Sequence, residues 1–155
     1  LLCGFYLNEL LVKFLAREDA YESLYDHYAQ TVFALSQITE SGAGIEQTLR
    51  PFELALLRET GYAAALDHCV ETQDRPIPDG RYVYQPEKGI RPWQTDDPGH
   101  WPVLTGTALK AMAQGDFTDS DTLSQSKQLM RFLLGIHLQD QALTTRQILI
   151  DLKKI

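Results

Sequence analysis

The chain has 155 residues, 44% of them hydrophobic and 23% charged, which are the proportions of a soluble globular protein with a sizeable core. Its formal net charge is −7, and an acidic chain repels nucleic acid at long range, so this composition is poor for direct DNA binding. Two cysteines, Cys3 and Cys69, are too few for a disulfide framework or a four-thiolate metal site.

The first residues carry a helical pattern over residues 2–16. This run lacks an initiator Met and opens in mid-pattern, so we interpret the sequence as a fragment of a longer chain. Polar residues interrupt it too early for a membrane span, and it lacks the basic n-region and small-residue cleavage site of a signal peptide. We therefore expect a cytoplasmic protein with no membrane partner. The clearest helix follows over residues 19–40, with Asp19 as its predicted cap and Glu22 three residues on.

A third helix is predicted over residues 49–62, in the stretch "LRPFELALLRETGY". Pro51 lacks an N–H and fits best in a first turn, which puts the start near Thr48 as a cap. Gly61 is the expected left-handed residue after the helix, in a Schellman ending.

This third helix is apolar on two sides. One side carries Phe52, Ala55 and Leu56, and the other carries Arg50, Leu54 and Leu57 at i, i+4 and i+7. The helix is therefore sandwiched in the core, or its second side is the wall of a groove. A cation at the head of an apolar stripe can receive a peptide with a hydrophobic end and a carboxylate. The alternative is a solvated Arg50 beside two core leucines.

The amino-acid composition changes between about residues 70 and 103, a segment that contains six of the seven prolines. Within it "RYVYQPEKGI" alternates aromatic residues and ends in turn residues, which suits a small hairpin or an irregular excursion. Helices resume near residue 105 or 107 and again at 121–138, and a last one is predicted to start at Thr144, capped as in a capping box. The predicted fold class is mainly α: one compact domain over residues 1–155, of about six helices, with a short β-like, Pro-rich excursion.

Catalytic and metal-binding patterns are weak. His68 and Cys69 are adjacent, but no second cysteine pair stands near them, and His100 alone does not complete a zinc site. A thiol nucleophile at Cys69 with His27 or His137 has no supporting signature, and phosphate and dinucleotide loops are absent from the sequence. We therefore predict that the protein binds no metal or cofactor and is not an enzyme.

The charged side chains suggest two kinds of surface. Acids isolated on helices are expected on solvated or ion-paired faces: Glu9, Glu53 and Glu59. Cations toward the C-terminus form a candidate DNA-binding patch: Lys127, Arg131, Arg146, Lys153 and Lys154. Two of these, at 127 and 131, are one helical turn apart, and the alternative to a patch is a solvated helix face.

Several of these blocks resemble a known family. "LNELL" at 7–11, the 49–62 stretch and "HC" at 68–69 resemble the C-terminal helical region of the bacterial RecO family of DNA repair proteins. "DTLSQSKQLMRFLLGIHL" and "LTTR" at 143–146 resemble the closing helices of that family, although "LTTR" departs from the more usual "L-K-S-R".

The resemblance implies a recombination mediator that is not an enzyme and lies in the cytoplasm, associated with the nucleoid. Such proteins work with RecR and RecF to load RecA onto DNA coated by single-strand-binding protein, SSB, and they anneal strands. DNA binding falls mainly to an N-terminal OB-fold, expected to lie outside this chain. In the family, the helical domain can bind the acidic, hydrophobic C-terminal tail of SSB through the arginine of the third-helix block. That arginine is Arg50 here, so the resemblance favours Arg50, Leu54 and Leu57 as a receiving side. Members with zinc carry cysteine pairs where this chain has only Cys69.

Overall fold

The computed structural model describes residues 2–16, 19–39, 42–63, 65–139 and 143–152, with side chains as far as 148. Within these residues there are six helices and three strands. The elements, in chain order, are α1 (Leu2–Phe14), α2 (Glu22–Ser36), α3 (Ile45–Glu59), β1 (Arg81–Gln85), β2 (Gly89–Pro92), β3 (Val103–Thr105), α4 (Gly106–Ala113), α5 (Ser120–Leu138) and α6 (Thr144–Leu152). The prediction of a mainly α fold is confirmed. No helix in these ranges is long and apolar enough to cross a membrane.

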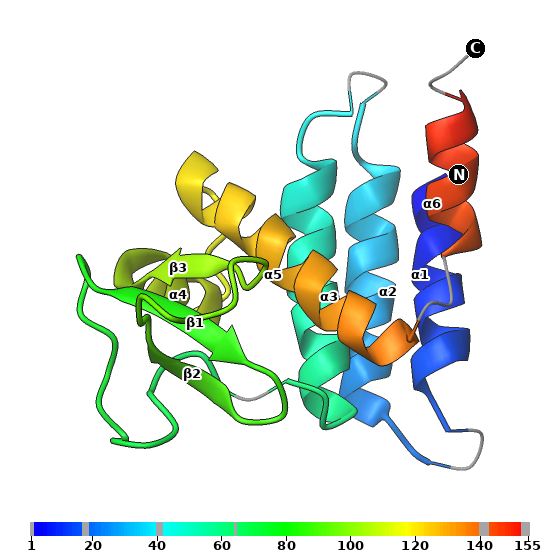
Figure 1. Ribbon diagram of the computed structural model, residues 1–155. Coiled ribbons are helices and arrows are strands. Elements are labelled where there is room, and N and C mark those ends of the chain that lie inside the picture. The colour runs from blue at the N-terminus through cyan, green and yellow to red at the C-terminus, as the bar shows by residue number, and fades with distance from the viewer. Residues whose placement is uncertain (1, 17–18, 40–41, 64, 140–142, 153–155) are drawn as a thin grey trace.

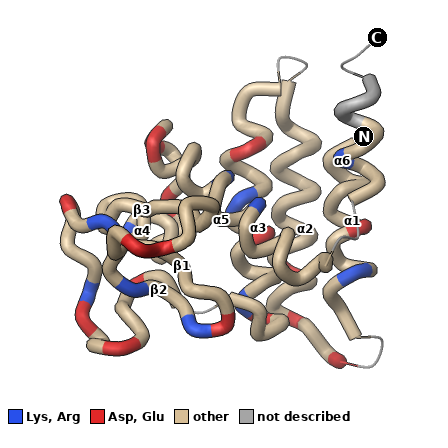
Figure 2. Tube along the Cα trace, in the orientation of Figure 1, with Lys and Arg blue, Asp and Glu red and all other residues tan. Residues whose placement is uncertain are grey.

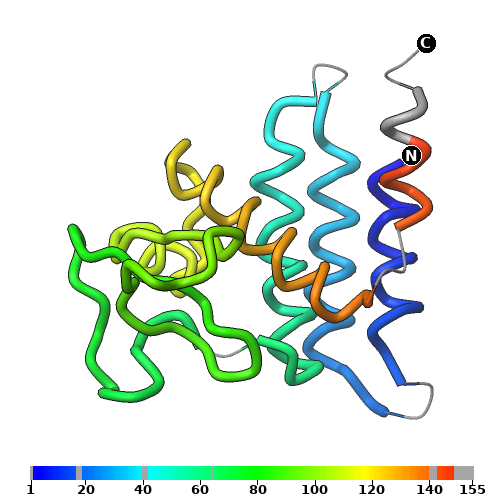
Figure 3. The backbone as a smooth tube through the Cα atoms, in the orientation of Figure 1, coloured from blue at the N-terminus to red at the C-terminus, as the bar shows by residue number. Residues whose placement is uncertain are grey.

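The helices form an array with the sheet at one end (Figure 1). α1, α2 and α3 stand side by side, α6 lies along α1, and α5 crosses α3 obliquely. The sheet and α4 lie beyond α3, on the far side from α1, as the backbone tube also shows (Figure 3). α5 packs against both α3 and α4, and α4 in turn contacts β3, so α5 connects the helical array with the part of the molecule that holds the sheet.

α3 is buried on both of its apolar sides. Phe52 and Leu56 on one side are fully buried, and so is Leu57 on the other, with Leu54 only 5% exposed. The reason is that α3 packs against α2 and also against α5, so each side meets a neighbouring helix. Of the two alternatives drawn from the sequence, the sandwiched helix is the one observed.

The two ends of α3 differ in how well local sequence predicts them. The predicted start at Thr48 is wrong: the helix begins at Ile45, and the Thr48 N–H already donates to the Gly44 carbonyl at 3.0 Å. Pro51 therefore lies inside the helix rather than in its first turn. The predicted ending is confirmed, because Gly61 is left-handed with φ 78° and the Tyr62 N–H donates to the Leu57 carbonyl at 2.7 Å.

The sheet is antiparallel, in the order β2-β1-β3, and β1 and β2 form the predicted hairpin. Side chains alternate along β1, so Tyr82 and Tyr84 join the hydrophobic core together with Ile90 and Leu104 of the neighbouring strands. The Tyr82 hydroxyl accepts a hydrogen bond from the Ile77 N–H at 2.9 Å, which ties the preceding segment to the sheet.

Two further predicted helix caps, at Asp19 and Thr144, are also wrong. α2 begins at Glu22, and Asp19 instead accepts a hydrogen bond from the Tyr21 hydroxyl at 3.3 Å. At the start of α6 the capping group is Glu9 of α1, which accepts from the N–H groups of Thr144 and Thr145 at 2.7 and 3.0 Å and from the Thr145 hydroxyl at 2.6 Å. α6 is thus capped by a carboxylate 135 residues away in the chain.

Replacing Glu9 with Gln is expected to lower the free energy of unfolding by about 1 kcal/mol at neutral pH, because the charged acceptor is lost. Partial burial works to raise the pKa of Glu9, but the hydrogen bonds from Thr145 and Thr144 outweigh it and hold this pKa below its usual value. A depressed folded-state pKa stabilises the protein above the unfolded-state pKa, and this contribution is lost as the pH falls through the folded-state value. Urea unfolding should therefore separate the variant from the parent most clearly at pH 7, and the difference should shrink as the pH falls through the depressed folded-state pKa of Glu9. An equal difference at neutral and at acidic pH would contradict this role.

Candidate functional site

A buried polar network joins α1 to α3. The Glu53 carboxylate is fully buried and accepts two short hydrogen bonds, from the Tyr6 hydroxyl on one oxygen and from Arg50 Nη1 on the other. Burial is the main influence on both acids: it raises the pKa of Tyr6, which Glu53 raises further, and it raises the pKa of Glu53 against the opposing effect of Arg50. The predicted ion-paired role of Glu53 is confirmed, but its predicted alternative, a solvated position, is wrong.

Arg50 is held by this network and is not a solvated residue. Its side chain is only 11% exposed, and its buried Nε has no hydrogen-bond partner in the part of the chain that the structure describes. The Nη1 group serves Glu53, so the edge of the guanidinium that carries Nε remains unused. This edge is the one that, with Nη2, binds carboxylates in a two-pronged manner.

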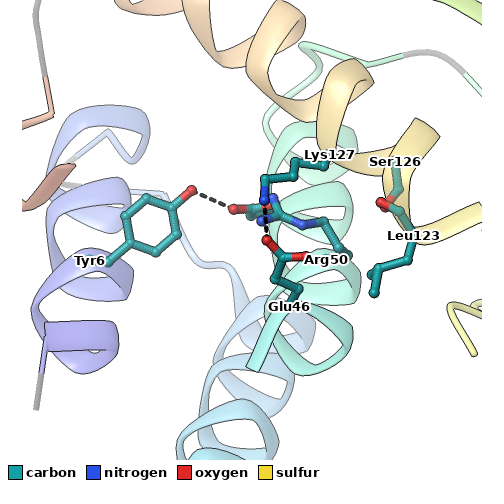
Figure 4. A network of polar contacts seen from close by, with 7 residues as sticks. Tyr6, Glu46, Arg50, Leu123, Ser126 and Lys127 are labelled. Carbon is teal, nitrogen blue, oxygen red and sulfur yellow. Dashed lines mark hydrogen bonds and ion pairs between the residues drawn. The ribbon is translucent and has the colours of Figure 1, made fainter. Parts of the chain in front are cut away.

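A second ion pair lies beside Arg50 and joins α3 to α5. Lys127 donates a short hydrogen bond to Glu46, which is one turn before Arg50 on α3 (Figure 4). The hydrogen bond from Lys127 is the largest influence on Glu46 and lowers its pKa, and the charges of Arg50 and Arg131 add to this effect. Figure 2 accordingly shows Lys and Arg positions where α5 crosses α3, whereas many acidic residues lie on the loops around the sheet.

Next to these cations the surface has a hollow of about 440 Å³, between α5 and the segment that leads into β3. It is lined by Gly99, His100, Trp101, Pro102, Val103, Gln128, Arg131 and Phe132. The rings of His100 and Trp101 lie 6.4 and 6.5 Å from that of Phe132, centre to centre. Arg131 is the one residue shared by the hollow and the cations around Glu46, and no hydrogen bond or ion pair engages its guanidinium within the described ranges.

The residues predicted from the sequence fall in different surroundings. Arg50 lies at the centre of the polar cluster, but Leu54 and Leu57 point into the core and do not line an open groove. Lys127 and Arg131 do lie together on α5. Of the remaining predicted DNA-binding cations, Arg146 is exposed on α6, and its charge weakly opposes the rise in the pKa of Tyr6. Lys153 and Lys154 lie outside the described residues.

Sequence reasoning missed the other members of this cluster: Tyr6, Glu46, His100, Trp101 and Phe132. The spacing of Glu46 and Arg50, four residues apart on one helix, was a signal for a shared electrostatic site. The aromatic hollow had no such signal, because its two walls are about 30 residues apart in the chain.

The candidate metal and thiol residues do not converge. Within the described residues no three His, Cys, Asp or Glu side chains could hold a metal ion. His68 contacts Asp67 at 2.9 Å, and Cys69 is buried, with a pKa that burial raises above the usual value of a thiol. A raised thiol pKa lowers the thiolate fraction at neutral pH and so disfavours nucleophilic chemistry at Cys69.

Comparison with known proteins gives one consistent family. The family described as the C-terminal part of recombination protein O matches residues 1–147. The chain is 72% identical over its full length to DNA repair protein RecO of Polynucleobacter asymbioticus and 71% identical to that of Polynucleobacter necessarius, and it spans 64% of the length of each. RecO of Ralstonia nicotianae is 53% identical over the whole chain, which covers 55% of that protein. The chain therefore belongs to the RecO family, within the part of it described as the C-terminal region.

Proposed function

We propose that this chain serves DNA repair as part of a recombination mediator that binds the C-terminal tail of SSB. In this role it would act with RecR and RecF at the nucleoid, in the cytoplasm, to help load RecA and anneal complementary strands. Membership of the RecO family supports the general role. The observation that supports tail binding is the gathering of Arg50, Lys127 and Arg131 where α3 meets α5.

The acidic part of such a tail matches these three cations. The guanidinium Nε of Arg50 lacks a hydrogen-bond partner among the described residues but is buried, whereas Lys127 and Arg131 stand one turn apart on α5. The burial of Leu54 and Leu57 means that they support the site from within the core. We assign the apolar end of the tail to the neighbouring hollow instead, where Trp101 and Phe132 provide aromatic surface.

The test is a titration of the 155-residue chain with an SSB tail peptide, comparing Arg50→Lys with the parent. Lysine keeps a positive charge beside Glu53 but removes the two-pronged edge, so the variant should fold and still bind the tail more weakly by about 1–3 kcal/mol. A peptide with an amidated C-terminus should lose affinity for the parent in the same way. Circular dichroism at the titration temperature shows whether the variant is folded.

Unchanged affinity of folded Arg50→Lys would remove Arg50 from the site. A single-stranded oligothymidylate titrated in parallel tests the alternative, a direct DNA-binding module. Lys127 and Arg131 lie together as that alternative requires, although Lys127 is already paired with Glu46. Salt-dependent binding of the oligonucleotide, without binding of the tail, would favour DNA over the peptide.

A further inference from the structure

We propose that the carboxylate of Glu46 is an internal stand-in for the ligand's carboxylate and competes with it for Lys127 and Arg50. This inference rests on the proposed function, because it concerns the same cationic site. It assigns Glu46 a role in setting the affinity of that site for a carboxylate ligand.

The first observation is the position of Glu46 among the cations. It contacts Lys127 of α5 directly and lies one helical turn from Arg50 of its own helix, and Figure 4 shows these three side chains together. The positive charge of Arg131, one turn beyond Lys127, also attracts the Glu46 carboxylate. A single carboxylate that faces three cations occupies the position where an anionic ligand would be most strongly attracted.

The second observation is the contrast between the two acids of this site. Glu53 is fully buried, and its two oxygens accept hydrogen bonds from Tyr6 of α1 and Arg50 of α3. If Glu53 moved away, Arg50 would be left as a buried cation without an ion-pair partner. Glu46, in contrast, has a side chain 43% exposed, and its partner Lys127 is 37% exposed. An exposed pair of this kind is worth little, so an incoming carboxylate can replace Glu46 at Lys127 at small cost.

The two acids therefore have different roles at one site. Glu53 orients the guanidinium of Arg50 from below, and Glu46 covers the cations from the solvent side until a ligand arrives. Removing the charge of Glu46 should therefore strengthen binding of a carboxylate ligand, whereas removing the charge of one of the cations should weaken it.

The test compares Glu46→Gln with Glu59→Gln as a matched control. Both substitutions remove one negative charge from the surface of α3, but within the described ranges Glu59 contacts Ser23 and no cation. Glu46→Gln should bind the SSB tail peptide about two- to fivefold more tightly than the parent, and Glu59→Gln should bind it with almost unchanged affinity. Lys127→Gln should weaken binding, which shows that the cation itself is used.

A small probe separates failure of this inference from failure of the proposed function. N-acetylphenylalanine and its amide can be titrated into the same proteins while the Nε–H resonance of Arg50 is followed by NMR. Tighter binding of the acid by Glu46→Gln than by Glu59→Gln, without binding of the tail, would support the inference and overturn the proposed function. Equal affinity of the two variants for tail and acid, or weaker binding by Glu46→Gln, would overturn the inference alone.

Discussion

Replacing Arg50 with Ala is expected to lower the free energy of unfolding at neutral pH by about 3–5 kcal/mol, because it leaves the fully buried Glu53 without its cation. Glu53 would keep only the hydrogen bond from Tyr6. Removing both charges should restore much of this loss, so the double variant Arg50→Ala/Glu53→Gln should be more stable than Arg50→Ala alone. Urea unfolding of the parent, Arg50→Ala, Glu53→Gln and the double variant gives the interaction free energy between the two side chains.

The loss of unfolding free energy caused by Arg50→Ala should be smaller at acidic pH than at neutral pH. Burial raises the pKa of Glu53, and loss of Arg50 removes the influence that opposes this rise. A group with a raised folded-state pKa contributes stability that is present below the unfolded-state pKa and is lost as the pH rises through the folded-state value. Arg50→Ala should therefore lose less stability relative to the parent at about pH 5 than at pH 7. Equal stability of Arg50→Ala and the parent at pH 7 would mean that the buried pair is not formed in solution.

Replacing Gly106 with Ala should cost about 3 kcal/mol, because the new methyl group would point directly into the Ile77 carbonyl, 2.5 Å from its carbon. This glycine is the first residue of α4, where its N–H donates to the Gly80 carbonyl at 3.1 Å. The backbone at Ile77 cannot move aside freely, because its own N–H is bound to the Tyr82 hydroxyl.

Gly135 provides the matched control for this substitution. It lies on an exposed part of α5, and apart from its chain neighbours and the backbone of its own helix no described atom comes within 4 Å of an added methyl group, so Gly135→Ala should stabilise the protein by up to about 1 kcal/mol. Thermal unfolding of the two variants should therefore show shifts of opposite sign. A stable Gly106→Ala protein would show that the 77–80 segment does not rest on α4 as closely as the structure has it.

Local sequence determined those features of this protein that depend on one or two turns of chain. Gly61 ends α3 because a glycine adopts a left-handed conformation without steric cost, and Asp119 caps α5 because its side chain reaches the N–H of Thr122. The helical periodicity and the turn residues after β1 act over similarly short distances. The mainly α class, most element positions and the family resemblance therefore follow from the sequence.

Tertiary structure decided the features whose partners are distant in the chain. Thr144 is not the cap of α6, because Glu9 arrives from α1 with a stronger, charged acceptor. The second oxygen of the buried Glu53 has a hydrogen-bond donor because α1 supplies Tyr6, and Glu46 meets a cation of another helix because α5 supplies Lys127. Sequence spacing placed Arg50 at a candidate site, but only the packing of α3 between α2 and α5 decided that Leu54 and Leu57 belong to the core. The physical reason is that burial and charge pairing depend on which helices meet, and periodicity within one helix carries no information about its neighbours.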